Sequence, residues 1–432
     1  MKPKVAIVGY GAEGRSAYRY FAARGADITI FHKARPADMP EDVKVVEESH
    51  AHDLTGYDIV VRSPAVRPES LETDGRITTV TKEFFSVFTS QRIIGVTGSK
   101  GKGTISALIY EMLKAAGKRV HLAGNIGAPV LELLPDIKDG DYVVLELSSF
   151  QLWDLEMSPH ISVVGMITPD HLDVHKGFDE YISAKANITR WQKPDDIVIY
   201  HPTNVHSKWI ADQSPATTKL QYASPEAAHI EDGHIVIAHQ QICNVGDVQI
   251  PGQHNLENIC AALTAAWQIT KDTQALAHAI REYRGLEHRI EFVRNVDGVD
   301  YYDDSFAAST SAAVVAAQAL KAPKVMILGG FDRGIDLEEM VGELGQTTIR
   351  KVLLIGQTAP RLAALFEAAG NGALVEQLGS LSMNDIVARA HKVAQKGDVV
   401  VLSPGSASFD MFRDYKDRGN QFKEAVRRYE HV

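Results

Sequence analysis

The stretch Ile93-Ile94-Gly95-Val96-Thr97-Gly98-Ser99-Lys100-Gly101-Lys102-Gly103-Thr104 decides the fold of this chain. An apolar run leads into a loop rich in glycine, and a helix-like segment follows from Ile105 to Ala116. A strand, a glycine loop and a helix N-terminus in this order hold nucleotide triphosphates, because the loop N–H groups can approach phosphates closely. The alternative is a glycine turn that serves the backbone alone.

The same loop supplies the candidate nucleotide-binding residues Gly98, Ser99, Lys100, Gly101, Lys102, Gly103 and Thr104. Lys102 would place a positive charge beside the phosphates. The strict P-loop pattern is not met, because Val96 stands at its first glycine and Gly103 at the Ser/Thr that should follow the lysine. Thr104 therefore has to supply the hydroxyl for Mg²⁺.

Length and charge limit the function further. The 432 residues are enough for about three domains. A net charge of -10 disfavours nucleic acid as the main partner. No apolar run reaches the ~18 residues that span a bilayer. The two cysteines suggest a reducing compartment, and no signal peptide precedes the expected strand Val5 to Val8, so we expect a cytoplasmic protein without membrane contact.

Residues 1–90 read as a small open parallel sheet with a GxGxxG turn from Gly9 to Gly14. An NAD site needs an acid at the end of the second strand, but the sequence there is Phe31-His32-Lys33. A pyrophosphate-containing ligand other than NAD fits better, and a dehydrogenase is the weaker interpretation. A turn needed only for helix–strand packing is the other alternative.

Two more α/β regions follow, which we expect at 91–286 and 287–432. Buried strands are predicted at the following positions: 142–146, 161–167, 197–200, 325–328, 352–355 and 399–402. The polar stretch 203–250 predicts a peripheral sheet, and an alanine-rich helix runs from Ile259 to Trp267. The expected fold class is α/β with three domains: two Rossmann-like domains around a central P-loop-type ATPase domain.

Candidate catalytic groups stand at predicted strand ends. Glu146 closes an apolar run and could bind Mg²⁺, or it is a solvated strand end. His171 follows the next strand and could reach a cation, with His175 and Asp173 as rivals. Lys185 lies in a predicted helix and could be an ordinary helix lysine. If buried, however, its amine can be neutral and take up CO₂ as a carbamate.

Three residues of the last region also occupy loops at expected strand ends. They are Asp304, Arg333 and Ser408. Arginine binds carboxylates bidentately, so Arg333 suits an acidic substrate. Each of the three could be an ordinary loop residue, and their shared placement is the reason to group them.

Several segments in order resemble one family: the glycine loop, Asn125-Ile126-Gly127, Glu146-Leu147-Ser148-Ser149-Phe150-Gln151-Leu152, Asp170-His171, Ala184-Lys185, His254-Asn255-x-x-Asn258, His288-Arg289, Asp304-Ser305 and Leu402-Ser403-Pro404. This order is similar to that of the Mur ligases of peptidoglycan synthesis, over essentially the whole chain. Within the family the chain is most similar to the ligases that add glutamate to UDP-N-acetylmuramoyl-L-alanine.

The resemblance implies an N-terminal domain for the UDP group, a central ATPase domain and a C-terminal domain for the amino acid. ATP would phosphorylate the alanine carboxylate, and the glutamate amine, expected to be D-glutamate, would displace the phosphate. The implied partners are UDP-N-acetylmuramoyl-L-alanine, glutamate and ATP, with Mg²⁺ or Mn²⁺ as the cation. The resemblance also implies carbamylated Lys185 and a monomer.

Site residues follow from the matched motifs. The resemblance implies catalytic roles for Lys102, Glu146, His171 and Lys185, and metal ligands in Thr104, Glu146, His171 and carbamylated Lys185. Asn258, Arg289 and Asp304 would complete the nucleotide site. The substrate-binding residues it implies are Ala12, Glu13, Lys33, Ser63 and Asn125 for the UDP substrate, and Arg333, Ser408 and Tyr415 for glutamate.

Two departures from the family pattern keep alternatives open. Lys100 stands where the family usually has asparagine, and in this respect the loop resembles that of folylpolyglutamate synthases. Phe306 stands where the third-domain motif often has lysine. The second departure leaves L-glutamate as an alternative substrate. A folate ligase is disfavoured by the well-formed region ahead of the glycine loop. A non-catalytic nucleotide-binding protein is disfavoured by Lys102, Glu146, His171 and Lys185 together.

Overall fold

The computed structural model describes residues 2–33, 35, 39–47, 51, 53–172, 174–332, 334 and 336–429. The chain forms two compact units. The first comprises Met1–Val248 with Gln253–Tyr283, and the second Gln249–Gly252 with Arg284–Val432. The domain boundaries expected near residues 90 and 287 stay predictions.

The first unit begins with a five-stranded parallel sheet of order β3-β2-β1-β4-β5. Its strands are β1 Lys4–Val8, β2 Asp27–Phe31, β3 Lys44–Val46, β4 Ile59–Arg62 and β5 Arg76–Thr78, and its helices are α1 Ala12–Ala22 and α2 Val80–Val87. Alternate residues of β1 face opposite ways, so Val5 and Ile7 join the core beneath these helices while Ala6 and Val8 join a second cluster. The parallel sheet predicted for this region is confirmed.

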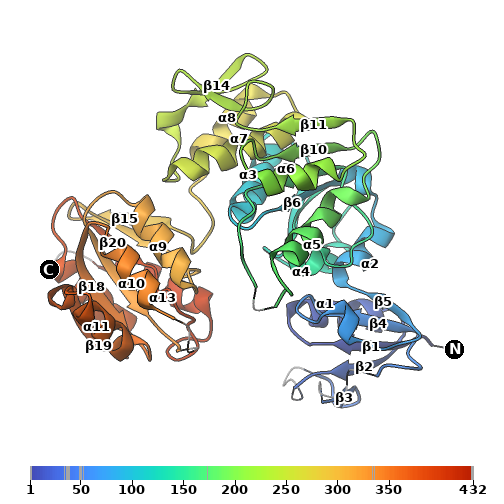
Figure 1. The fold of residues 1–432 in the computed structure, drawn as a ribbon, viewed down its shortest axis with the longest axis horizontal. Coiled ribbons are helices and arrows are strands. Elements are labelled where there is room, and N and C mark those ends of the chain that lie inside the picture. Colours follow the sequence, from blue (N-terminus) through green and yellow to red (C-terminus); the bar gives the residue numbers. More distant parts are fainter. Residues whose placement is uncertain are drawn as a thin grey trace. The chain divides into compact units, whose positions relative to one another are not determined.

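A second parallel sheet in the same unit has the order β11-β10-β9-β6-β8-β7. The strands are β6 Ile93–Thr97, β7 Val120–Gly124, β8 Tyr142–Glu146, β9 Ile161–Val164, β10 Ile197–Tyr200 and β11 Thr218–Gln221. The helices are α3 Lys102–Ala115, α4 Ser149–Leu152, α5 Phe178–Arg190, α6 Val205–Asp212, α7 Gln253–Trp267 and α8 Thr273–Glu282. Helix α3 packs against both α7 and α8, which follow it far along the chain (Figure 1).

The region around 203–250 differs in part from its prediction. A small antiparallel sheet is present, formed by β12 His229–Glu231, β13 His234–Ile237 and β14 Gln240–Asn244. The same region also contains α6, and β11 belongs to the large sheet. Strand β9 ends at Val164 rather than at Ile167, because the chain turns there and the Met166 carbonyl accepts from the Ser99 N–H at 2.8 Å.

The second unit is built on a six-stranded sheet of order β15-β16-β20-β17-β18-β19. Its strands are β15 Glu291–Val296, β16 Val299–Asp303, β17 Lys324–Gly329, β18 Ile349–Ile355, β19 Val375–Gly379 and β20 Val399–Leu402. Its helices are α9 Thr310–Ala319, α10 Glu338–Leu344, α11 Ala359–Ala368, α12 Met383–Val393 and α13 Tyr415–Arg428. Strands β15 and β16 form an antiparallel hairpin, and the other pairs are parallel.

Helices cover both faces of this sheet (Figure 1). Met326 and Leu328 pack with residues of α9, α10 and α11, whereas Val325 and Ile327 pack with residues of α12 and α13. The expected α/β class is therefore confirmed. Of the helices that the structure describes, none combines the length and the apolar character needed to cross a bilayer.

Candidate active site

The carboxyl ends of β6, β8 and β9 bring three loops together. Strand β6 pairs with β8 on one side and β9 on the other, so the chain order reverses at β6. Ligands of open α/β sheets bind at such reversal points, outside the carboxyl ends of the strands. The glycine loop, the residues after Glu146 and the segment leading to His171 all start there.

The glycine loop needs its glycine at position 101. Gly101 has φ +82°, and a Cβ there would lie 2.4 Å from Oδ1 of Asn258. The Asn258 side chain, which donates to Asn255 Oδ1 at 3.0 Å, therefore lies directly against the loop. Lys102 begins α3, with Nζ 3.4 Å from the Ser99 carbonyl. The structure thus brings Asn258, from α7, to the loop that the sequence identified.

Ser99 fixes the loop to the segment after β9. Its N–H donates to the Met166 carbonyl, and its buried hydroxyl lies 2.7 Å from the Thr168 carbonyl and 2.8 Å from the Tyr181 hydroxyl. The donors of Ser99 are thus engaged within the protein. Other N–H groups at the start of α3 remain for an anion, which the helix N-terminus favours.

Glu146 ends β8 as predicted and is 5% exposed. Asn125 donates from Nδ2 to Glu146 Oε1 at 2.7 Å, which joins two residues that the sequence singled out separately. No described residue donates to Oε2, so one carboxylate oxygen is left for a cation. A carboxylate beside a phosphate-binding loop fits Mg²⁺, which prefers one or two carboxylates together with substrate phosphates.

Lys185 is 1% exposed in α5 and points into the same edge of the sheet. Its Nζ donates to the Gly98 carbonyl at 3.0 Å and lies 4.7 Å from the centre of the Tyr181 ring. Burial, followed by the positive charge of Lys102, holds the pKa of Lys185 well below its ordinary value, against the opposing effects of Asp170 and Glu146. Lys185 therefore meets the condition of burial on which its uptake of CO₂ was predicted.

The two histidine rivals occupy different environments. His171 has φ +53°, its side chain is 49% exposed, and its ring lies 5.0 Å from that of Phe150. His175 is 3% exposed, and its Nε2 is 3.0 Å from the Ser149 hydroxyl. His171 is the histidine that remains available to a ligand. Asp173 lies outside the described residues.

Asp170 is a site residue that sequence reasoning did not select. Its Oδ1 accepts from the His171 N–H at 3.0 Å, and its charge acts on Lys185. The signal was available, because Asp170 directly precedes His171 in the loop after a buried strand.

The GxGxxG turn after β1 is shaped by packing. A Cβ on Gly14 would lie 2.2 Å from the Gly9 carbonyl oxygen, and a Cβ on Gly9 2.5 Å from Ser63 Oγ. Ser63 donates from its hydroxyl to the Gly9 carbonyl at 3.1 Å, so the loops after β1 and β4 meet. Ala12 opens α1, and Lys33 is exposed just after β2.

Glu13 connects this turn to α4. Gln151 donates from Nε2 to Glu13 Oε1 at 2.6 Å, and burial raises the pKa of Glu13 although this bond and Arg62 oppose the rise. Oε2 of Glu13 is buried without a hydrogen-bond partner among the described residues. The predicted UDP-site residue is therefore in direct contact with the Ser-Ser-Phe-Gln segment after Glu146.

A buried arginine, which the sequence did not identify, makes a second connection. Arg62 has no exposed side-chain surface and donates to Asp154 Oδ1 at 2.6 Å and to the Phe150 carbonyl at 3.2 Å. It also donates to the carbonyls of Pro64 and Val66. The loop after β4 is thus fixed to α4.

In the second unit, Asp304 is buried immediately after β16. Ser403 donates to its Oδ2 at 2.6 Å and the Ile290 N–H to its Oδ1 at 3.1 Å. Burial raises its pKa to about 7. Both oxygens therefore accept hydrogen bonds within the protein, and the ribose contact expected of Asp304 stays a prediction.

The neighbouring loops of this unit are held by a second buried arginine. Arg418 is fully buried, and its pKa is lowered to about 10 by desolvation. It donates to Ser305 Oγ at 2.9 Å and to the carbonyls of Ser305, Ser406 and Ala407. Ser408 is buried beside this network, Tyr415 opens α13, and Arg333 lies outside the described residues.

Within the described part of the chain, three acidic or histidine side chains converge at one place, formed by His288, Glu291 and Asp303. The Nζ of Lys423 lies 3.0 Å from Glu291 Oε2, so a cationic group is already present there. His288 Nδ1 is 2.7 Å from Asp303 Oδ2. The cluster is accounted for by these internal interactions.

Comparison with known proteins decides the family. Residues 96–266 match the Mur ligase middle domain, and residues 288–405 match the Mur ligase, glutamate ligase domain. The chain is 37% identical to the UDP-N-acetylmuramoylalanine--D-glutamate ligase of Acetivibrio thermocellus, over 98% of this chain and 96% of that protein. It is 34% identical to the enzyme of the same name from Clostridium acetobutylicum, with the same coverage.

The chain is a Mur ligase.

Solved structures of other Mur ligases share the fold. A MurF of Acinetobacter baumannii matches 98% of this chain and 93% of its own with a TM-score of 0.61 at 16% identity. MurC of Thermotoga maritima matches 98% and 99% with a TM-score of 0.60 at 16% identity. MurF of the same organism, in complex with ADP, gives 0.59 at 18% identity over 99% and 95%.

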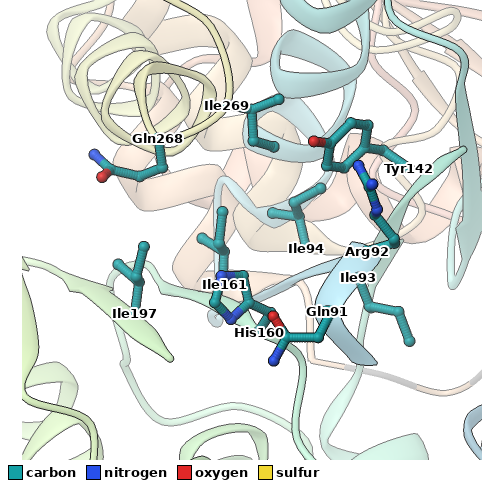
Figure 2. A pocket seen from close by; sticks show the side chains of 10 residues that line it. All are labelled: Gln91, Arg92, Ile93, Ile94, Tyr142, His160, Ile161, Ile197, Gln268 and Ile269. Atoms are coloured by element: carbon teal, nitrogen blue, oxygen red, sulfur yellow. The ribbon is translucent and has the colours of Figure 1, made fainter. Parts of the chain in front are cut away.

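A cavity of about 280 Å³ lies at the opposite edge of the central sheet of this Mur ligase (Figure 2). Ile93, Tyr142 and Ile161 line it from the first residues of their strands, and the Arg92 guanidinium lies 4.8 Å from the centre of the Tyr142 ring. The glycine loop, Glu146 and Lys185 all lie at the carboxyl edge. We therefore place the candidate active site at the carboxyl edge of the sheet and not in this cavity.

Proposed function

We propose that this chain is an ATP-dependent ligase that joins D-glutamate to UDP-N-acetylmuramoyl-L-alanine, with ADP and phosphate as the other products. The observation that carries the proposal is the group formed by Lys102, Glu146 and Lys185 around the glycine loop. The near full-length identity to D-glutamate ligases supports the choice of substrates. We further propose that the enzyme is a cytoplasmic monomer.

The chemistry needs activation of a carboxylate. An alanine carboxylate oxygen attacks the γ-phosphorus of ATP and releases ADP, which gives an acyl phosphate. The glutamate amine adds to the acyl carbon, loses a proton and expels phosphate, which leaves an amide. Positioning and neutralisation of charge dominate such transfers. Lys102 would bind the phosphates, while Glu13, Ser63 and Asn125 would hold the UDP substrate.

Mg²⁺ at Thr104 and Glu146 would neutralise the charge of the phosphates. We propose that Lys185 acts as a carbamate, because it is buried beside the glycine loop and a lowered pKa increases the share of neutral amine, the form that can bond to CO₂ with loss of a proton. The carbamate and His171 would hold a second cation. A ¹³C resonance of a carbamate after incubation with ¹³C-bicarbonate, absent in Lys185→Ala, would support this role, and its absence from the wild-type protein would contradict it.

Release of ADP tests the proposal. The purified chain is incubated with ATP, Mg²⁺ and UDP-N-acetylmuramoyl-L-alanine, with D-glutamate, L-glutamate or neither, and in parallel with a folate in place of the UDP substrate. We expect release with D-glutamate only. Release with L-glutamate instead would favour the alternative raised by Phe306, and release only with a folate acceptor would point to the other ligase class.

Isotope transfer tests the intermediate. Substrate labelled with ¹⁸O in the alanine carboxylate should deliver label to the released phosphate, because one carboxylate oxygen leaves with the phosphoryl group. Unlabelled phosphate during amide formation would rule out the acyl phosphate.

A further inference from the structure

The guanidinium of Arg289 rests on an exposed aromatic ring. Its Cζ lies 4.7 Å from the centre of the Phe306 ring, and no described residue accepts a hydrogen bond from this side chain. A guanidinium over a ring face keeps its N–H edges free, so it can still donate to an oxyanion. Phe306 is 43% exposed and is not among the residues of the two hydrophobic clusters of this unit.

Phe306 is itself fixed from three directions. Its N–H donates to the His288 carbonyl at 2.9 Å, which joins its loop to the residue before Arg289. Its ring meets Tyr415 edge-on, with centroids 5.1 Å apart and planes at 83°. Arg418 holds the preceding residue, Ser305, through both its hydroxyl and its carbonyl. A ring anchored in this way restricts where the guanidinium can lie.

We propose that Phe306 is a positioning residue that holds Arg289 ready to bind an anionic oxygen group of a substrate. This group is either a phosphate of the nucleotide or a carboxylate of glutamate, since Phe306 contacts both Arg289 and Tyr415. The inference rests on the proposed function, because both anions are substrates of that reaction. Loss of the cation–π contact at an exposed site weakens binding about two- to fivefold.

Steady-state kinetics of Phe306→Leu, with Phe306→Tyr as the conservative variant, test this role. We expect the leucine variant to raise KM for ATP or for glutamate about two- to fivefold with little change in kcat, and the tyrosine variant to retain wild-type values. A rise in KM for ATP alone assigns the anion to the nucleotide, and a rise for glutamate alone to the amino acid. Phe292→Leu, at a ring that is 37% exposed and packs on Tyr302, is the matched control and should change neither constant.

A double mutant shows whether Phe306 acts through Arg289. In the Arg289→Ala background, Phe306→Leu should cause no further rise in KM. An equal rise in both backgrounds, unchanged KM values in the single variant, or a fall in kcat alone with a lower melting temperature would each overturn the inference.

Direct binding separates this inference from the proposed function. Calorimetric titration with a non-hydrolysable ATP analogue and with D-glutamate measures both affinities without turnover. If no acceptor supports ADP release but Phe306→Leu binds the nucleotide analogue or D-glutamate about two- to fivefold more weakly than wild type does, the proposed function fails and the role of Phe306 stands. If ADP release occurs and neither affinity changes, only the role of Phe306 fails.

Discussion

Lys185 donates a hydrogen bond of 3.0 Å from its side-chain nitrogen to the backbone carbonyl of Gly98, at the start of the glycine loop. A helix lysine and a loop carbonyl that are 87 residues apart are thus joined at the edge of the central sheet. Because the lysine is fully buried, any loss of its side chain changes both the charge and the shape of that edge.

Lys185→Ala should be nearly inactive, with ADP release at least about 100-fold slower, because the proposed carbamate would be lost. Short carboxylic acids such as acetate should restore part of the rate by occupying the same position. Lys324→Ala is the matched control, since Lys324 is also buried with a lowered pKa but lies in β17 of the other unit. Full activity of Lys185→Ala, or equal stimulation of both variants by acetate, would contradict the carbamate.

Gly101→Ala should weaken nucleotide binding and lower the free energy of unfolding by about 1–2 kcal/mol, the cost of a left-handed alanine. The added Cβ would also lie 2.4 Å from Oδ1 of Asn258, so either this side chain or the loop must move. Gly117→Ala has φ +70° but open space around the new Cβ, so it should share the backbone strain without the loss of affinity. Titration with ATP measures the loss of affinity, and thermal melting measures the loss of stability. Equal ATP affinity of the two variants would show that the contact of the new Cβ with Asn258 does not affect nucleotide binding.

Glu146→Gln should raise the Mg²⁺ concentration needed for half-maximal activity by about tenfold or more, because a neutral amide is a weak ligand for this cation. Glu111→Gln, on the surface of α3, should leave it unchanged. Magnesium titration of ADP release is the measurement. An unchanged midpoint in the Glu146→Gln variant would contradict the proposed role of Glu146 as a metal ligand.

Asp304 makes stability depend on pH. Its pKa is about 7 in the folded chain and close to the ordinary 3.8 in the unfolded chain. Between these values the folded state keeps a proton that the unfolded state has released, so its contribution to the free energy of unfolding is present at low pH and is lost as pH rises through 7. Asp304→Asn removes this loss, which is at most about 4 kcal/mol.

Denaturation of wild type and Asp304→Asn at pH 5 and pH 8 tests the sign. We expect the variant to gain stability relative to wild type at the higher pH. Asp336→Asn, an exposed position of the same unit, should show no such gain. A stability difference that is independent of pH would mean that Asp304 does not titrate in this range.

Local patterns predicted the strands and their ends well. Apolar runs closed by Glu146, Asp304 or a glycine identify the carboxyl edges of the sheets, where the candidate site residues lie, because the period and length of such runs depend only on neighbouring residues. Gly101 was identified as part of the glycine loop, whereas its left-handed conformation was not predicted. The Mur resemblance then supplied the order of the motifs, which no single motif carries.

Tertiary contacts were beyond such reasoning. Nothing local distinguishes Arg62 or Arg418 from a surface arginine, yet each is buried and donates to a carbonyl of a distant segment. Strand β9 ends early because the glycine loop binds its continuation, and β15 is antiparallel because it forms a tight hairpin with β16. The burial that lowers the pKa of Lys185 likewise exists only once α5 packs on the sheet.

The ion pair of Arg62 with Asp154 bears on whether the first 90 residues can exist alone. The Nζ of Lys82 also contacts Asp154, at 3.1 Å. Burial raises the pKa of Asp154, but the charges of Arg62 and Lys82 outweigh this effect and keep the pKa below its ordinary value. A fragment cut after α2 would lose that carboxylate and leave the Arg62 guanidinium without its counter-ion. Residues 1–90 should therefore be insoluble when expressed by themselves and become soluble when co-expressed with the remainder.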